Sequence, residues 1–185
     1  MTLVCATRTE ARAARRLGAS TAVVGVGVRG ELPDGPLVSF GLAGALHDQL
    51  SCGEVLDATR VVDTTGKTLW QGGPLGVVGG REATIAAVER IVDEPAERRR
   101  LHEVTGADAV DMESGAIAES GRLAGCLRAV SDTPSRTLGS LADALSSDGR
   151  LFWRHLGRAL MHPRQTGRAL GDARRALRRL KEVGV

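Results

Sequence analysis

The segment Val110–Ala118 places two acidic residues where a strand-like run meets a helix. An apolar lead-in is followed by Asp111-Met112-Glu113, and small residues then continue at helical spacing. We therefore expect a short buried strand that runs into a close-packed helix, with a carboxylate held at the junction. A buried carboxylate there can accept two charge-assisted hydrogen bonds from a vicinal diol. The alternative is that both acids only complement the dipole of the helix.

Two further carboxylates could take part in chemistry. Asp132 ends an apolar run, Leu127–Asp132, that finishes in Ser131-Asp132 and precedes Thr133-Pro134. Its ordinary role would be to cap the following turn or helix. Glu10 lies in the first predicted helix, where a carboxylate is most often simply exposed to solvent.

A glycine-containing segment follows the predicted strand Leu37–Phe40. We expect Gly41-Leu42-Ala43-Gly44 to form a turn at the carboxyl end of that strand. Ligands in open α/β sheets bind outside the carboxyl ends of strands. Glycines at such a turn let backbone N–H groups approach an anion or a water molecule closely. The alternative is an ordinary turn that only ends the strand.

Strand-like and helical patterns alternate along the chain. Strands are predicted at Thr2–Ala6, Thr21–Val26, Pro36–Phe40, Glu54–Val62, Leu75–Val78, Asp108–Val110 and Cys126–Ser131. Helices are predicted at Arg8–Leu17, Glu82–Val92, Pro95–Val104 and Met112–Ala124, and from Leu138 to the end with a break at Pro163. This alternation predicts an α/β fold with a mixed or largely parallel sheet.

Several function classes are disfavoured by the sequence. Gly25–Gly30 satisfies the dinucleotide pattern G-x-G-x-x-G, but Glu31–Pro36 follows it with two prolines and a glycine, which cannot continue the helix that the motif needs. The four histidines and three cysteines lack metal-ligand spacing, so we expect no metal and no cofactor. The three cysteines are far apart and odd in number, which is typical of reduced thiols in a cytosolic protein. No run approaches the length of a membrane span, and few aromatics accompany the basic residues, so we expect no binding to nucleic acid.

The positive charge is concentrated at the C-terminal end. Residues 150–185 contain ten Lys or Arg and two acids, a net charge of +8, which leaves −5 for residues 1–149. We expect residues 1–149 to form one α/β domain and residues 150–185 a basic helical extension. The 3–4 spacing predicts an amphipathic helix, whose apolar residues are Leu170, Ala173, Leu177 and Leu180. The helix spanning residues 163–185 is expected either to lie on an anionic membrane surface or to pack on the body of the protein.

The motifs occur together in an order that resembles one enzyme superfamily. The early Glu10, the segment Ser39-Phe40-Gly41-Leu42-Ala43-Gly44, Val110–Ala118 and the strand ending Arg128-Ala129-Val130-Ser131-Asp132 are similar to the purine nucleoside phosphorylases and nucleosidases. Within that superfamily the chain most resembles the hopanoid-associated phosphorylases, also described as adenosylhopane nucleosidases. The resemblance implies a three-layer fold with a central mixed β-sheet flanked by helices, and a homo-oligomer.

The resemblance also implies a reaction and a set of roles. Asp132 would protonate the purine at N7 as general acid, and Glu10 would orient or deprotonate an attacking water molecule. Glu113 would bind the ribose 2′- and 3′-hydroxyls, and Met112 would pack against the sugar. Gly41, Ala43, Gly44 and Ser131 would line the substrate. The substrate would be a purine nucleoside, with adenosylhopane, methylthioadenosine-type or futalosine-type compounds as the options.

Three departures from the family pattern leave alternatives open. The family's phosphorylases have an early Gly-Asp-Pro-x-Arg segment, whereas this chain has Cys5–Glu10, so hydrolysis is favoured over phosphorolysis. The family's helix after its G-x-G turn is replaced by the short segment Gly30–Pro36, and Gly72–Leu101 is also shortened. Among Phe40, Trp70, Phe152 and Trp153, the ring that would stack on the base is left open. A non-catalytic nucleoside-binding or membrane-associated protein is the second hypothesis.

Overall fold

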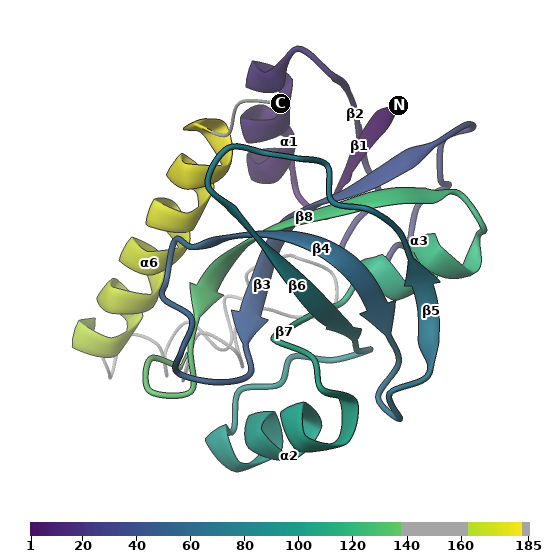
Figure 1. Cartoon of the computed structure of the whole chain (residues 1–185). Coiled ribbons are helices and arrows are strands. Elements are labelled where there is room, and N and C mark those ends of the chain that lie inside the picture. The colour runs from purple at the N-terminus through teal and green to yellow at the C-terminus, as the bar shows by residue number, and fades with distance from the viewer. Residues whose placement is uncertain (138–162, 183–185) are drawn as a thin grey trace.

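Eight strands form one mixed sheet with helices packed on both sides (Figure 1). The computed structural model describes residues 1–137 and 163–182. The strands are β1 (Thr2–Cys5), β2 (Ser20–Val23), β3 (Leu37–Ala45), β4 (Val55–Val62), β5 (Thr68–Gln71), β6 (Gly80–Ala87), β7 (Ala109–Asp111) and β8 (Leu123–Asp132). The expected α/β architecture, a central mixed sheet flanked by helices, is confirmed.

Five strands pair into a closed ring. β3 pairs with β7 and β8, β4 pairs with β6 and β8, and β6 pairs with β7. β1 and β2 extend the sheet in parallel beyond β3, and β5 adds an antiparallel edge beyond β4. Because β3 and β8 lie side by side over nearly their whole length, residues far apart in the sequence meet along this pair.

The helices follow recognisable start and stop signals. Thr7 caps α1 (Arg8–Ala14) in a capping box, and a short 3-10 turn (Arg15–Leu17) ends it at Gly18. α2 (Pro95–Thr105) begins with proline in its first turn and ends at Gly106, whose φ of 66° is left-handed. α3 spans Ser114–Glu119 and α6 spans Pro163–Glu182. α1 and α6 contact each other on one side of the molecule, and α3 packs on the other.

Several elements differ from the sequence-based prediction. Glu82–Val92, predicted as a helix, is largely strand β6, because pairing with β4 and β7 overrides the helical preference of its alanines. The predicted helix Met112–Ala124 is shortened to α3, since β8 already begins at Leu123. Leu75–Val78 is a loop, and β5 was not anticipated.

Strand β3 corrects a prediction that concerns the site. The segment Gly41–Gly44 is not a turn at the end of a strand, because β3 continues through it to Ala45 and pairs with β8 over this stretch. The two glycines therefore lie inside a central strand. Their lack of a side chain leaves room for charged groups that lie against the sheet.

Helix α6 packs its apolar face on the protein. Ala169, Ala176 and Leu180 are buried, and the helix contacts β8 and α1. Asp172 is buried and accepts from Arg136 at 3.0 Å. Of the predicted apolar stripe, Leu180 lies in the core, whereas Leu170 is exposed. The helical prediction for residues 138–162 lies outside the described residues.

Candidate active site

Glu113 lies at the junction of β7 and α3, as the sequence predicted. Its side chain is buried, its Oε1 accepts a hydrogen bond from the Gly27 N–H at 3.1 Å, and its Oε2 lies 3.8 Å from the Arg128 guanidinium. Burial raises the pKa of Glu113 to about 7, and the guanidinium of Arg128 opposes this. The neighbouring carboxylates of Asp111 and Glu10 raise the pKa further. Glu113 is therefore a carboxyl group that lacks sufficient donors of its own.

A buried arginine, Arg128, lies next to Glu113 and pairs closely with other residues. The Arg128 side chain is 1% exposed, and its Nε donates to Asp111 at 2.6 Å and its Nη2 to Ser39 Oγ at 2.5 Å. Asp111 in turn accepts from the backbone N–H and the hydroxyl of Ser114, at the start of α3. Asp111 therefore neutralises Arg128 and anchors the helix, while Glu113 is only a more distant neighbour of the same guanidinium.

Glu10 is held between α1 and β3. Its Oε2 accepts from the backbone N–H and the hydroxyl of Thr7, both at 2.8 Å, and its Oε1 accepts from the Leu42 N–H at 3.1 Å. Glu10 is buried, so the prediction that it belongs to the site is compatible with its location, although it also caps α1. A Cβ on Gly41 would lie 2.5 Å from Glu10 Oε1 and 2.7 Å from Arg128 Nη1.

Asp132 belongs to a second charged group further along β3 and β8. It does not serve chiefly as a cap, because its Oδ2 pairs with the Arg98 guanidinium and its Oδ1 accepts from the Ser131 hydroxyl. A register shift falls between Ala43 and Gly44, opposite Ser131. Bulges of this kind redirect side chains next to functional sites. Burial raises the pKa of Asp132, and the charge of Arg98 opposes the rise.

The remaining predicted residues lie near these two groups. Gly44 faces Asp132, since a Cβ there would lie 3.0 Å from Asp132 Oδ2. The carbonyl of Ala43 is 3.2 Å from the Ser131 hydroxyl. Met112, which precedes Glu113 in the sequence, is partly buried. The structure therefore joins Glu10, Glu113 and Gly41 in one group and Asp132, Ser131, Ala43 and Gly44 in another.

Three residues that contact the candidate site residues were given no role by the sequence-based prediction. Arg128 was part of the motif that ends in Asp132, and its charge inside an apolar strand is a signal for a buried ion pair. Arg98 looks like any arginine of a charged helix. Gly27 belongs to the glycine motif that was set aside as a dinucleotide site, and its N–H contacts Glu113 instead. The neighbouring Val28 has a φ of 54°, a left-handed backbone conformation that is rare for a β-branched residue.

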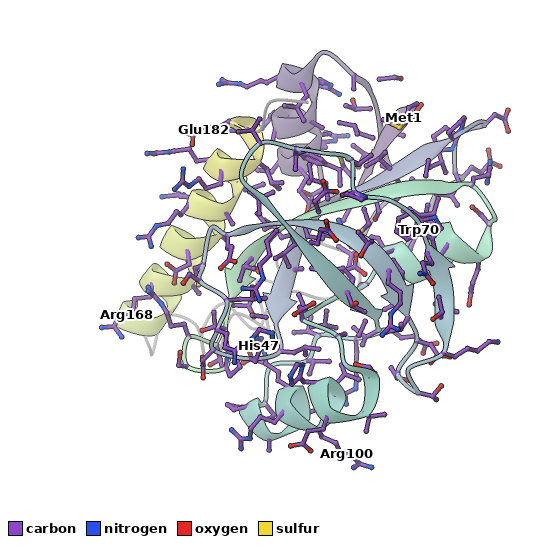
Figure 2. The ribbon with its side chains drawn as sticks, in the orientation of Figure 1. Met1, His47, Trp70, Arg100, Arg168 and Glu182 are labelled. Atoms are coloured by element: carbon purple, nitrogen blue, oxygen red, sulfur yellow. The ribbon has the colours of Figure 1, made fainter. Side chains whose placement is uncertain are left out.

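Burial limits which of the aromatic side chains can stack on a ligand. Phe40 is fully buried in the core, so it is not available to stack on a ligand. Trp70 on β5 is partly buried against the core, at the edge of the sheet (Figure 2). Phe152 and Trp153 lie outside the described residues. Within residues 1–137 and 163–182, no cluster of three potential metal ligands occurs.

Comparison with solved structures connects this fold with nucleosidases. The 5′-methylthioadenosine/S-adenosylhomocysteine nucleosidase of Chlamydia trachomatis aligns with a TM-score of 0.60 and 16% identity over 98% of this chain and 93% of that chain. The corresponding nucleosidase of Helicobacter pylori aligns with a TM-score of 0.57 and 15% identity, over 87% of this chain and 97% of that chain. The futalosine hydrolase of the same organism aligns with a TM-score of 0.55 and 15% identity, with the same coverage of the two chains. No protein-family model and no curated protein matches the sequence. The chain therefore has the fold of purine nucleosidases.

Proposed function

We propose that this chain is a nucleosidase that hydrolyses the N-glycosidic bond of a purine nucleoside. The observation that carries the proposal is the meeting of Glu10 and Glu113 over the buried Arg128, on a fold shared with nucleosidases. A sugar-binding carboxylate needs hydroxyl donors, and Glu113 is buried with one backbone donor and a distant guanidinium. The 2′- and 3′-hydroxyls of a ribose supply the missing donors, with Met112 packed against the sugar.

Asp132 acts as the general acid at N7 of the base. Cleavage develops positive charge on the ribose and negative charge on the leaving purine, so a proton delivered to the base lowers the barrier. Burial raises the pKa of Asp132, which favours its protonated form. Water adds to the anomeric carbon as the bond to the base breaks.

Water is preferred to phosphate as the acceptor. Glu10 is anchored by three donors and retains lone pairs that can orient and deprotonate water. A phosphate dianion would face the charges of both Glu10 and Glu113. Phosphorolysis is therefore the less favourable reaction.

The finer substrate proposal is adenosylhopane, with methylthioadenosine, adenosylhomocysteine or futalosine as the alternatives. The sequence resemblance supports the hopanoid assignment. The loop that contacts Glu113 is followed by the short, largely exposed segment Gly30–Pro36 in place of the family's helix. A shortened wall beside the sugar leaves space for a bulky apolar substituent. The charge on α6 adds a means of reaching a lipid-linked substrate.

The membrane proposal is restricted by the packing of α6. Its buried stripe is not available for insertion into lipid, so attraction must come from the exposed arginines. Arg168 extends away from the body of the protein in Figure 2, and Arg174, Arg175, Arg178 and Arg179 are also exposed. No helix within the described part of the chain is long and apolar enough to cross a bilayer. Contact with anionic lipid would therefore be electrostatic and sensitive to salt.

Base release tests the proposed activity. Purified protein is incubated with each candidate nucleoside, and free adenine (hypoxanthine from futalosine) and the sugar product are measured by chromatography with and without phosphate. We expect ribose-type products in both buffers and a loss of about 10²–10⁴-fold in rate for Asp132→Asn. Glu119→Gln, an exposed change on α3, is the matched control. Equal release by the wild type and Asp132→Asn would overturn the assignment.

Two association proposals have separate tests. Binding to phosphatidylglycerol vesicles should occur at low salt, disappear at high salt and weaken when Arg174 and Arg178 are replaced by Gln. Binding that is unchanged by these replacements would contradict the electrostatic model.

The homo-oligomer implied by the resemblance remains a prediction, which light scattering after gel filtration tests.

A further inference from the structure

Arg98 is a buried arginine that the proposed reaction does not use directly. It lies on α2, its side chain is 1% exposed, and two backbone carbonyls fix its position. Its Nε donates to Val92 O and its Nη1 to Ala45 O, both at 2.9 Å. The remaining nitrogen, Nη2, is directed at Asp132 and also lies 3.5 Å from Asp93. The guanidinium is therefore clamped with one edge facing a single buried carboxylate.

The two oxygens of Asp132 have different partners. Arg98 occupies Oδ2, and the Ser131 hydroxyl donates to Oδ1. The Ser131 hydroxyl also lies 3.2 Å from the carbonyl of Ala43. Because a hydroxyl has one proton to donate, it can satisfy the ionised Asp132 or turn to Ala43. In the second case the Ser131 oxygen accepts a hydrogen bond from the O–H of a protonated Oδ1.

We propose that Arg98 is a positioning residue that fixes Oδ2 of Asp132 and controls its charge, leaving Oδ1 as the oxygen that carries the transferable proton. The contact with Arg98 holds the Asp132 carboxyl group in one orientation, and the Ser131 hydroxyl can hydrogen-bond to both its ionised and its protonated form. This inference rests on the proposed function only where it assigns the proton on Oδ1 to the base. The pairing itself is a property of the free protein.

The charged and titratable surroundings of Asp132 define the expected direction. Arg98 on α2 attracts the ionised form, whereas Asp93, just before α2, opposes it. Cys52, in the turn before β4, also interacts with the charge of Asp132. Removal of Arg98 must therefore raise the pKa of Asp132, and removal of the Asp93 charge must lower it.

A direct titration tests the control of charge. The Asp132 carboxyl carbon is followed by NMR against pH, with Asp132→Asn to assign the signal. Arg98→Gln should raise the midpoint by about 1–3 pH units, and Arg98→Lys should recover part of the shift because it restores the charge. Arg100→Gln is the matched control, since Arg100 is exposed on the same helix and extends away from the body in Figure 2.

Asp93→Asn covers the case in which Arg98→Gln does not fold. The Asp93 side chain is 22% exposed, so this change is easily accommodated, and it should lower the Asp132 midpoint. The proposal is overturned if the titration midpoint of Asp132 does not shift in opposite directions in Arg98→Gln and Asp93→Asn. If only Asp93→Asn folds, an Asp132 midpoint equal to the wild-type value overturns it.

Turnover gives an independent test of the acid role. The alkaline limb of kcat/KM against pH should move with the NMR midpoint in each variant. If the wild type releases no base, the proposed function fails, and the NMR titration still decides the role of Arg98. A limb that stays fixed while the NMR midpoint moves would show that Arg98 controls a carboxyl group that is not the acid.

Discussion

Replacement of Glu113 by glutamine should stabilise the protein at alkaline pH while it removes the carboxylate that we propose binds the sugar. Glu113 is buried, and its pKa is raised from 4.5 to about 7 by that burial. Since the unfolded chain has the ordinary pKa, the folded state holds a proton between these values that the unfolded state releases. Stability therefore falls as the pH rises from 4.5 to 7, and the full cost persists above pH 7.

The size of the effect follows from the pKa difference. Each pH unit corresponds to about 1.36 kcal/mol, so the ionised Glu113 costs on the order of 3 kcal/mol above pH 7. Glutamine keeps the shape and can accept from Gly27 N–H but carries no charge. Glu113→Gln should therefore raise the melting temperature by about 6–12 °C at pH 8, at about 2–4 °C per kcal/mol for this chain length.

Thermal unfolding followed by circular dichroism at pH 5 and pH 8 measures this gain. Most of it should be absent at pH 5, where the native Glu113 is largely protonated and already neutral. Glu119→Gln, exposed at the end of the same helix, should change the melting temperature little at either pH. A gain of equal size at both pH values, or a loss at pH 8, would refute the electrostatic reasoning.

Three other outcomes are expected. Gly41→Ala should lower the free energy of unfolding by about 1–3 kcal/mol and reduce base release, since the added Cβ would lie under 3 Å from two charged side chains. Gly73→Ala is the control, because a Cβ at Gly73 meets no atom within 4 Å and should leave the stability unchanged. Leu180→Ala should lower the free energy of unfolding in urea by about 2–4 kcal/mol, and the exposed Leu170→Ala by under about 0.5 kcal/mol. Equal losses in the two variants would contradict the packing of α6 on the protein. Nucleoside affinity, measured by calorimetry, should rise nearly tenfold per pH unit below about 7 and level off above it as Glu113 ionises, and a flat profile would contradict this.

Local patterns in the sequence were sufficient for the architecture and for the location of Glu113. Alternating strand-like and helical runs predicted the α/β fold, and the apolar lead-in to an acid placed Glu113 at the start of a helix. The errors arose where pairing overrides propensity. An alanine-rich segment became β6, and a glycine pair that resembles a turn became the middle of β3.

The partners of the site residues could not be predicted, because they are distant in the chain. Gly27 and Glu113 are 86 residues apart, Arg128 and Ser39 are 89 apart, and Arg98 and Asp132 are 34 apart. Single-sequence periodicity reports on neighbours within a few residues. These contacts arise only when β3, β8, β4, β6 and β7 pair into the ring and α2 lies against the ends of β3 and β8.

The contrast between the two acids, one at the start of α3 and the other at the end of β8, fits the different roles proposed for them. Both Glu113 and Asp132 are buried, so desolvation raises the pKa of each. In the free protein Asp132 already has the Arg98 guanidinium on one oxygen and the Ser131 hydroxyl on the other. Glu113 shares its arginine with Asp111, which takes the close contact, and is left 3.8 Å away. A ligand that brings hydroxyl donors should therefore be stabilised more at Glu113 than at a fully paired carboxylate, and this incomplete pairing is why we propose Glu113 as the sugar-binding group.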